Sequence, residues 1–273
     1  INMEGGGGFE IWQHTGKKPE MRKEPVKAGD FGINIVKMKC RDINLCYKDL
    51  SAKKVDILSD IRKNPEGTDH FFVKDIFDNC FEFIEDDNHF LKKNTNGGVF
   101  GAYIGVENIE ESLKVYQDIL GYDAIVYDHT GKFDDLEDIA GGKEEMRRVL
   151  LRHSNKRTGP FAPLLGPTEI ELLQVKNRNA GDIFEGRIWG DPGFIHICFD
   201  IFGMDALREE VIEKNFPFTV DSANSFDMGE AAGHFSYIQA PENTLIEFVE
   251  THKVPVLKKM GWYINLKDRK PGK

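Results

Sequence analysis

The sequence predicts a mixed α/β fold built from repeated modules. Three segments share one order of elements, namely strand, helix, strand, strand, strand (βαβββ). The first and last strands of each segment alternate apolar with polar residues, as half-buried strands do. A helix with an apolar stripe follows each first strand. The predicted fold class is therefore α/β (α+β), with repeated βαβββ modules.

The clearest module covers residues 193–252. Its opening strand, residues 194–201, places His196 among apolar neighbours, and its closing strand, residues 243–250, does the same with Glu247. The helix between them has one apolar face, formed by Met204, Leu207, Val211 and Ile212. This module sets the pattern for the other two.

The other two modules cover residues 99–176 and 30–86. Each has the same opening strand, amphipathic helix and closing strand. When the closing strands are aligned, three glutamates fall in one column: Glu82, Glu171 and Glu247. When the opening strands are aligned, a second column contains Ile35, Gly101 and His196.

The remaining segments connect or flank these modules. We expect residues 1–13 to form the last hairpin of an incomplete first module, with Glu10 in the glutamate column and the glycines before it in a turn. Residues 14–29 are a polar linker, and residues 253–273 form a basic C-terminal tail. An insertion beginning at Phe133 either covers a binding site or is a solvated surface helix.

Composition excludes several classes of partner. The net charge of −10 argues against binding a nucleic-acid backbone, and no apolar run reaches the roughly 18 residues that span a membrane. The four cysteines form no CxxC pair, which favours buried free thiols in a reducing compartment. The cytoplasm is thus the default location. An incomplete first module would leave an open sheet edge, which a homodimer could cover.

The helix that begins at Ile109 and the closing strand around Glu82 resemble the vicinal oxygen chelate superfamily. This superfamily includes glyoxalase I, extradiol dioxygenases, methylmalonyl-CoA epimerase and the bleomycin- and fosfomycin-resistance proteins. The resemblance covers most of residues 27–252. It implies that each module's sheet curls into a half-barrel cup and that two modules pair around a cavity. It does not define the reaction, because one scaffold supports many chemistries.

The resemblance also implies a metal site. His196 and Glu247 would face one cup and bind a divalent ion such as Fe, Mn, Zn or Ni. The module of residues 99–176 would complete this cup, with Glu171 as third ligand or as catalytic base and with Gly101 contributing nothing. The alternative is a purely structural role, in which His196 is a hydrogen-bonded core residue and the glutamates line a polar cavity.

Three functions follow from these residues. The first is proton-transfer chemistry by a metal-dependent isomerase, lyase or epimerase acting on a small molecule with adjacent oxygens. An extradiol dioxygenase ranks below it, because Gly101 stands where that enzyme class has a second histidine. His153 and His234 could compensate, but the resemblance places no ligands at their positions. The third is a metal-free binding cup, as in the antibiotic-resistance relatives, with a substrate pocket that includes His234, Tyr103 and Phe199.

Overall fold

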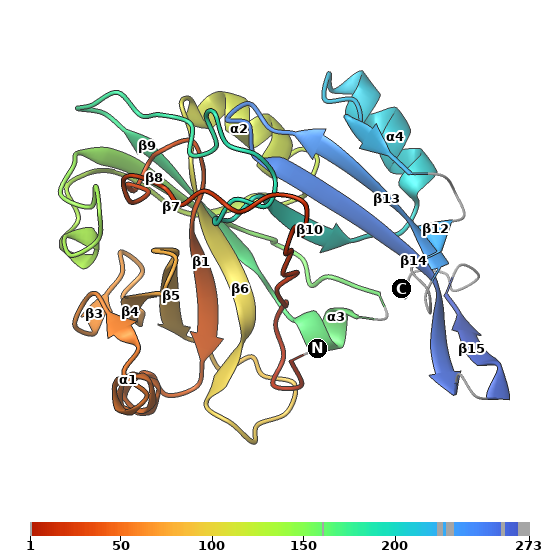
Figure 1. The fold of residues 1–273 in the computed structure, drawn as a ribbon, viewed down its shortest axis with the longest axis horizontal. Helices are drawn as coiled ribbons and strands as arrows, with labels where there is room; N and C mark the ends of the chain where they lie inside the picture. The colour runs from red at the N-terminus through yellow and green to blue at the C-terminus, as the bar shows by residue number, and fades with distance from the viewer. Residues whose placement is uncertain (1, 160, 223–225, 228–231, 258–259, 267–273) are drawn as a thin grey trace. The chain divides into compact units, whose positions relative to one another are not determined.

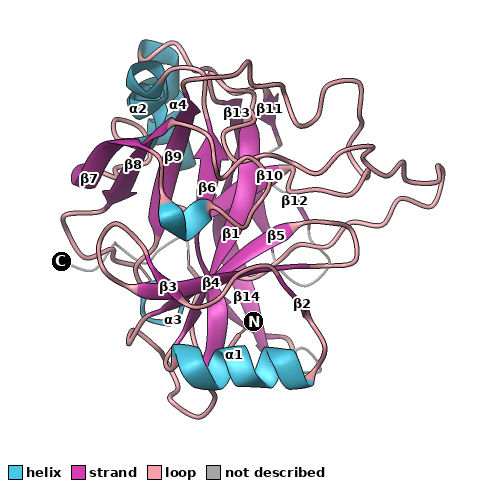
Figure 2. Ribbon diagram, turned by 90° about the vertical axis from the view of Figure 1, so that its left-hand side faces the viewer, coloured by secondary structure: helices cyan, strands magenta, loops and turns pink. Residues whose placement is uncertain are grey.

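The computed structural model describes residues 2–159, 161–222, 226–227, 232–257 and 260–266. The chain separates into two compact units, Ile1–Ile195 and His196–Lys273, which we call the N-terminal unit and the C-terminal unit. Each unit has its own sheet (Figure 1). Strands predominate and helices are few (Figure 2), so the predicted mixed α/β (α+β) class is confirmed.

The N-terminal unit contains two of the predicted modules. The first consists of β1 (Gly32–Cys40), α1 (Ile43–Ala52), β2 (Asp56–Ile57), β3 (Arg62–Lys63), β4 (Asp69–Lys74) and β5 (Cys80–Glu85). The second consists of β6 (Asn96–Gly105), α2 (Ile109–Tyr116), β7 (Ala124–Gly131), the 3-10 helix η1 (Asp134–Leu136), β8 (Met146–Arg152), α3 (Ala162–Leu165) and β9 (Glu169–Val175).

These strands form a single nine-stranded sheet. Its order is β2-β4-β5-β1-β6-β9-β8-β7, with β3 paired to β4. Within each module the closing strand lies parallel to the opening strand, and the two modules meet where β1 and β6 pair antiparallel. Figure 1 shows these two opening strands side by side at the centre of the unit.

Local sequence explains where the helices begin and which face they bury. The Asp42 carboxylate accepts a hydrogen bond from the Leu45 N–H at the start of α1, and Asn108 caps α2 in the same way. One face of α1 is buried with side chains of β1 and β4 in an apolar cluster: Cys40, Ile43, Cys46, Leu50, Phe71 and Val73. The helix therefore covers one face of its module's sheet.

The insertion after β7 packs into the core of the N-terminal unit. Leu136 and Ile139 are buried in a cluster with Ile35, Phe72 and Tyr103. Arg62 of β3 forms ion pairs with the acidic side chains that follow η1. The insertion therefore covers the sheet face that contains Ile35.

Strand register brings the two predicted columns together. Ile35 lies opposite Cys80, two residues before Glu82. Gly101 lies opposite Glu169, two residues before Glu171. In the C-terminal unit, His196 lies opposite Leu245, two residues before Glu247. Since side chains two residues apart on a strand share a face, each module places its two column residues beside one another.

The C-terminal unit contains the last module. It consists of β10 (His196–Asp200), α4 (Met204–Glu213), β11 (Val220–Asp221), β12 (Phe226–Asp227), β13 (Ala232–Gln239), β14 (Leu245–Leu257) and β15 (Trp262–Asn265). Its sheet has the order β10-β14-β13-β11, with β12 on β13 and β15 on β14. The strand expected to end near Glu250 continues to Leu257, so much of the predicted tail belongs to this sheet; residues 258–259 and 267–273 lie outside the described chain.

One predicted pairing is wrong. We expected the module of residues 99–176 to complete the cup of the last module. Instead, β6 is hydrogen-bonded to β1 along one edge and to β9 along the other. A strand has only two hydrogen-bonding edges, so β6 has no edge left to pair with the opening strand of the last module.

The expected hairpin in residues 1–13 is not formed by the described residues 2–13. Gly7 makes a single antiparallel bridge to Val99 of β6 instead. A Cβ atom on Gly6 would lie 2.8 Å from the Gly98 backbone. The glycines therefore permit two segments of the chain to approach closely and do not form a hairpin turn. Among the described helices, none combines the length and apolar character needed to cross a membrane.

Candidate functional site

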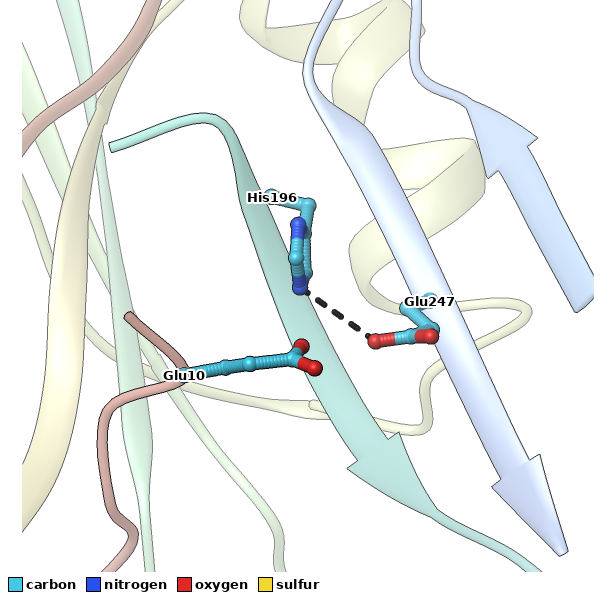
Figure 3. Close-up of side chains that lie close together, drawn as sticks. All are labelled: Glu10, His196 and Glu247. Atoms are coloured by element: carbon cyan, nitrogen blue, oxygen red, sulfur yellow. Dashed lines mark ion pairs between the residues drawn. The ribbon is translucent and has the colours of Figure 1, made fainter. Parts of the chain in front are cut away.

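His196 and Glu247 form the centre of the candidate site in the C-terminal unit. They come from neighbouring parallel strands, β10 and β14, and lie on the same face of the sheet. The His196 Nε2 atom lies 3.3 Å from the Glu247 Oε2 atom (Figure 3). The two predicted ligand positions of this module are therefore adjacent.

Two further polar side chains of the same unit surround Glu247. Cys198 on β10 and Tyr237 on β13 each lie opposite Glu247 in the strand register. The Tyr237 ring also contacts the His196 ring edge-on, with 5.7 Å between centroids. Burial favours a neutral Glu247, but hydrogen bonds with His196, Tyr237 and Cys198 prevail and lower its pKa below the usual value. Glu247 is thus a carboxylate at neutral pH.

This donor set fits a divalent transition metal. Imidazole nitrogen and carboxylate oxygen are ligands that Zn, Fe, Mn and Ni accept. Two donor atoms that each lie about 2.1 Å from one ion, at tetrahedral or octahedral angles, are separated by about 3.0 to 3.4 Å. The 3.3 Å between His196 Nε2 and Glu247 Oε2 falls in that interval.

Distance alone does not define a site, because a second pair in the same unit has the same spacing. His252 Nε2 lies 3.3 Å from Glu250 Oε2. The Glu250 carboxylate, however, accepts a hydrogen bond from the backbone N–H of Gly203 at the start of α4. That pair has a structural role as a helix cap. His196 and Glu247, in contrast, lie at the aligned positions of the opening and closing strands for which metal ligands were predicted.

Glu171 lies in a different environment from the one predicted. It is fully buried in the N-terminal unit, where it accepts hydrogen bonds from Lys37 Nζ (2.9 Å), Tyr127 Oη (2.7 Å) and Arg148 Nε (2.7 Å). Burial opposes its ionisation, yet Arg148 and Lys37 outweigh that effect and lower its pKa to about 2. A carboxylate held by two cations is a weak base and a poor metal ligand.

The predicted pocket residues also have other partners. The Tyr103 hydroxyl is buried and donates to Glu82 Oε1 at 2.7 Å. Phe199 is one position from Cys198 on β10, so alternation places it on the face opposite His196. His234 lies on the face of β13 opposite Tyr237, where its Nε2 is 2.7 Å from Asp221 Oδ1.

His153, the other histidine considered as a ligand, has a structural role. Its Nε2 lies 3.1 Å from the Leu120 carbonyl oxygen, and its ring packs on Tyr122. It belongs to the N-terminal unit, as does the Tyr122 ring. Neither His153 nor His234 therefore resembles a compensating ligand.

Cys198 was not predicted to belong to the site. Cys198 was expected to be a buried thiol, but it is exposed. Its position two residues after His196 was the available signal, since alternation places both on one face. Tyr237 becomes a neighbour only through the pairing of β13 with β14, which the sequence does not specify.

Comparison with known proteins identifies the architecture. No protein-family model and no curated relative matches the chain. Among solved structures, a Bacillus subtilis protein described as a dioxygenase is similar with a TM-score of 0.52 and 12% identity, over 81% of this chain and 63% of the other. Glyoxalase I from Zea mays gives a TM-score of 0.51 and 13% identity, over 81% and 68%.

This chain thus spans less than two thirds of the length of the Bacillus protein. At 12–13% identity, the likeness concerns the backbone architecture and not the reaction. It agrees with the register of the modules, in which each closing strand lies parallel to its opening strand. The chain has the vicinal oxygen chelate fold.

Proposed function

We propose that the C-terminal unit holds a divalent metal ion through His196 and Glu247. With this ion, the chain would catalyse proton transfer on a small molecule with adjacent oxygens, as an isomerase, lyase or epimerase. The observation that carries the proposal is the 3.3 Å approach of His196 Nε2 to Glu247 Oε2 at the two column positions. Glu171 is left out of the proposed site, because Lys37 and Arg148 already neutralise it.

Each residue of the site has a distinct part. His196 and Glu247 would hold the ion, which would supply a Lewis acid for a substrate oxygen. Tyr237 and Cys198 hydrogen-bond Glu247, which keeps its carboxylate charged and fixes its orientation. Loss of either group would weaken metal binding without removing a metal ligand.

The test is metal content per chain, measured by elemental analysis on protein purified without a chelator or a histidine tag. We expect near-stoichiometric Fe, Mn, Zn or Ni in the wild type and a loss of at least tenfold in occupancy in His196→Ala and Glu247→Gln. His252→Ala is the matched control, since it removes a histidine with the same 3.3 Å spacing to a glutamate in the same unit.

Two results would reject the metal site. One is a wild-type chain that stays free of metal after reconstitution with each of the four ions. The other is an equal loss of metal in His252→Ala and His196→Ala. A positive result would justify assays with α-hydroxy ketone, thiohemiacetal, acyl-CoA and catechol substrates, in which the catechol assay tests the dioxygenase alternative.

A second candidate function, metal-free binding of a small molecule, is favoured by a cavity in the N-terminal unit. The cavity has a volume of about 300 Å³. Ile35 and Cys80, which lie opposite each other in the strand register, line it together with Val26, Leu58 and Ile139 and with the charged residues Lys74, Asp78 and Asp138. An alkyl group therefore lines the cavity where the last module has a histidine, and a ligand with an apolar body and a polar end would suit it.

A fluorescent probe with an apolar ring system and an anionic end, such as anilinonaphthalene sulfonate, tests this second function. Binding should persist in the presence of a chelator and fall at least fivefold in Val26→Trp, which places a large side chain in the cavity. Val126→Trp is the control, because Val126 is exposed on β7 and does not line the cavity. Equal probe binding by the two variants would exclude this cavity as the site.

A further inference from the structure

The paired modules of the N-terminal unit enclose a cluster of buried charges at the position that corresponds to the proposed metal site of the last module. The column glutamates Glu82 and Glu171 both point into it, and Glu169 joins them. All three carboxylates are fully buried. Three buried carboxylates without a cation would repel one another strongly, so something must neutralise them.

Lys37 is a cation that reaches all three carboxylates, while Arg148 also pairs with Glu171 and Arg152 with Glu169. The Lys37 ammonium nitrogen lies 2.6 Å from Glu169 Oε1, 2.9 Å from Glu171 Oε2 and 3.7 Å from Glu82 Oε2. An ammonium group has three N–H donors, and here three carboxylates surround it. The lysine is itself fully buried and lies on β1 two residues after Ile35, so its side chain shares the face of that column residue.

The histidine column of these two modules cannot supply a metal ligand. Ile35 is an alkyl side chain buried in the apolar cluster with Phe72 and Tyr103. At Gly101, a Cβ atom would lie 2.1 Å from the Glu169 carbonyl oxygen, so no side chain fits there. The histidine column therefore offers no nitrogen donor in these two modules, and the cluster already contains a cation.

We infer that the Lys37 ammonium takes the place of a divalent metal ion between the modules of residues 30–86 and 99–176. This cup excludes metal and is held closed by an internal cation instead. The lysine joins the two modules, since it extends from β1 of one module to Glu169 and Glu171 on β9 of the other. Removal of the ammonium should leave a latent divalent-metal site made of the remaining carboxylates and His70, whose Nδ1 lies 2.6 Å from Glu82 Oε1.

The first arm of the test uses the chain with its natural Lys37. In a His196→Ala background, which removes the proposed site of the other unit, we expect less than a tenth of an equivalent of metal per chain. Stoichiometric metal in that background that disappears when Glu171→Gln is added would overturn the inference. This arm does not depend on whether the C-terminal unit binds metal.

The second arm removes the ammonium while conserving the buried charge. In the same His196→Ala background, Lys37→Met is combined with Glu169→Gln, so one positive and one negative charge are lost together. The latent ligands Glu82, Glu171 and His70 are retained. We expect this variant to bind one equivalent of Mn²⁺ or Co²⁺ in equilibrium dialysis, and its melting temperature to rise by several degrees when the ion is added.

Lys39→Met is the matched control, because Lys39 is another buried lysine on β1 and donates to the Asn88 carbonyl rather than to the cluster. It should gain no metal and show no metal-dependent shift in melting temperature. The inference fails if the charge-conserving variant folds, as judged by its circular dichroism, and binds no more ion than this control. If that variant does not fold, Lys37→Gln in the same background serves as the second variant, with the same two readouts.

Discussion

The loss of Arg148 should be far more costly than the loss of an equally well-paired surface arginine. Arg148 is fully buried, and its guanidinium donates through Nε to Glu171 Oε1 at 2.7 Å and through Nη1 to both oxygens of Asp135 at 2.8 Å. Arg148→Met keeps most of the apolar volume but removes the charge. Lys37 still pairs with Glu171 in the variant, whereas the ion-pair partner that Asp135 keeps among the described residues is His70, whose Nε2 is 3.6 Å away.

We expect Arg148→Met to lower the free energy of unfolding by about 3 to 5 kcal/mol, the usual cost of leaving a buried charge without its partner. The matched control is Arg62→Met. Arg62 also pairs with two carboxylates, Glu137 and Asp138, but its side chain is 25% exposed, and such pairs contribute about 0 to 1 kcal/mol. The two variants remove the same chemical group from the same unit and differ mainly in burial.

Equilibrium unfolding in urea, followed by far-ultraviolet circular dichroism, measures both free energies. The loss of unfolding free energy in Arg148→Met should become smaller as the pH falls. Burial outweighs Arg148 and already raises the pKa of Asp135, so without the arginine this carboxyl takes up a proton more readily and the uncompensated charge disappears. If the two variants differ by less than about 1 kcal/mol at neutral pH, the reasoning from burial is refuted.

Three further predictions follow from single side chains. The pKa of Glu171 is lowered to about 2, so its ionised form stabilises the fold above about pH 4.5, and this contribution is lost as the pH falls toward 2. The difference in unfolding free energy between wild type and Glu171→Gln should therefore shrink over that pH range. A constant difference would contradict this prediction. Gly101→Ala should destabilise the chain by about 1 to 3 kcal/mol, because its Cβ would lie 2.1 Å from the Glu169 carbonyl oxygen. Gly131→Ala, in the same module with open space around its Cβ, should change little in the same urea titration. The exposed thiol of Cys198 should react with a disulfide reagent before the other three cysteines, and the fast phase should vanish in Cys198→Ser.

The sequence by itself determined the repeating architecture. Alternation in the strands and an apolar stripe on each helix depend on local periodicity, which any one segment contains in full. The columns of His196 and Glu247 could be aligned for the same reason, since residues two apart on a strand share a face wherever that strand lies. The fold class and the adjacency of these two residues were therefore predictable.

Only the tertiary structure decided which modules pair and what neutralises the buried carboxylates. The pairing of β6 with β1 depends on which strand edges, from modules far apart in the sequence, compete to pair with β6. Lys37 is one polar residue in a strand until that pairing places Glu169 and Glu171, more than a hundred residues away, within reach of its ammonium. Electrostatic energies depend on distance in space and on burial, and neither can be read from the order of residues.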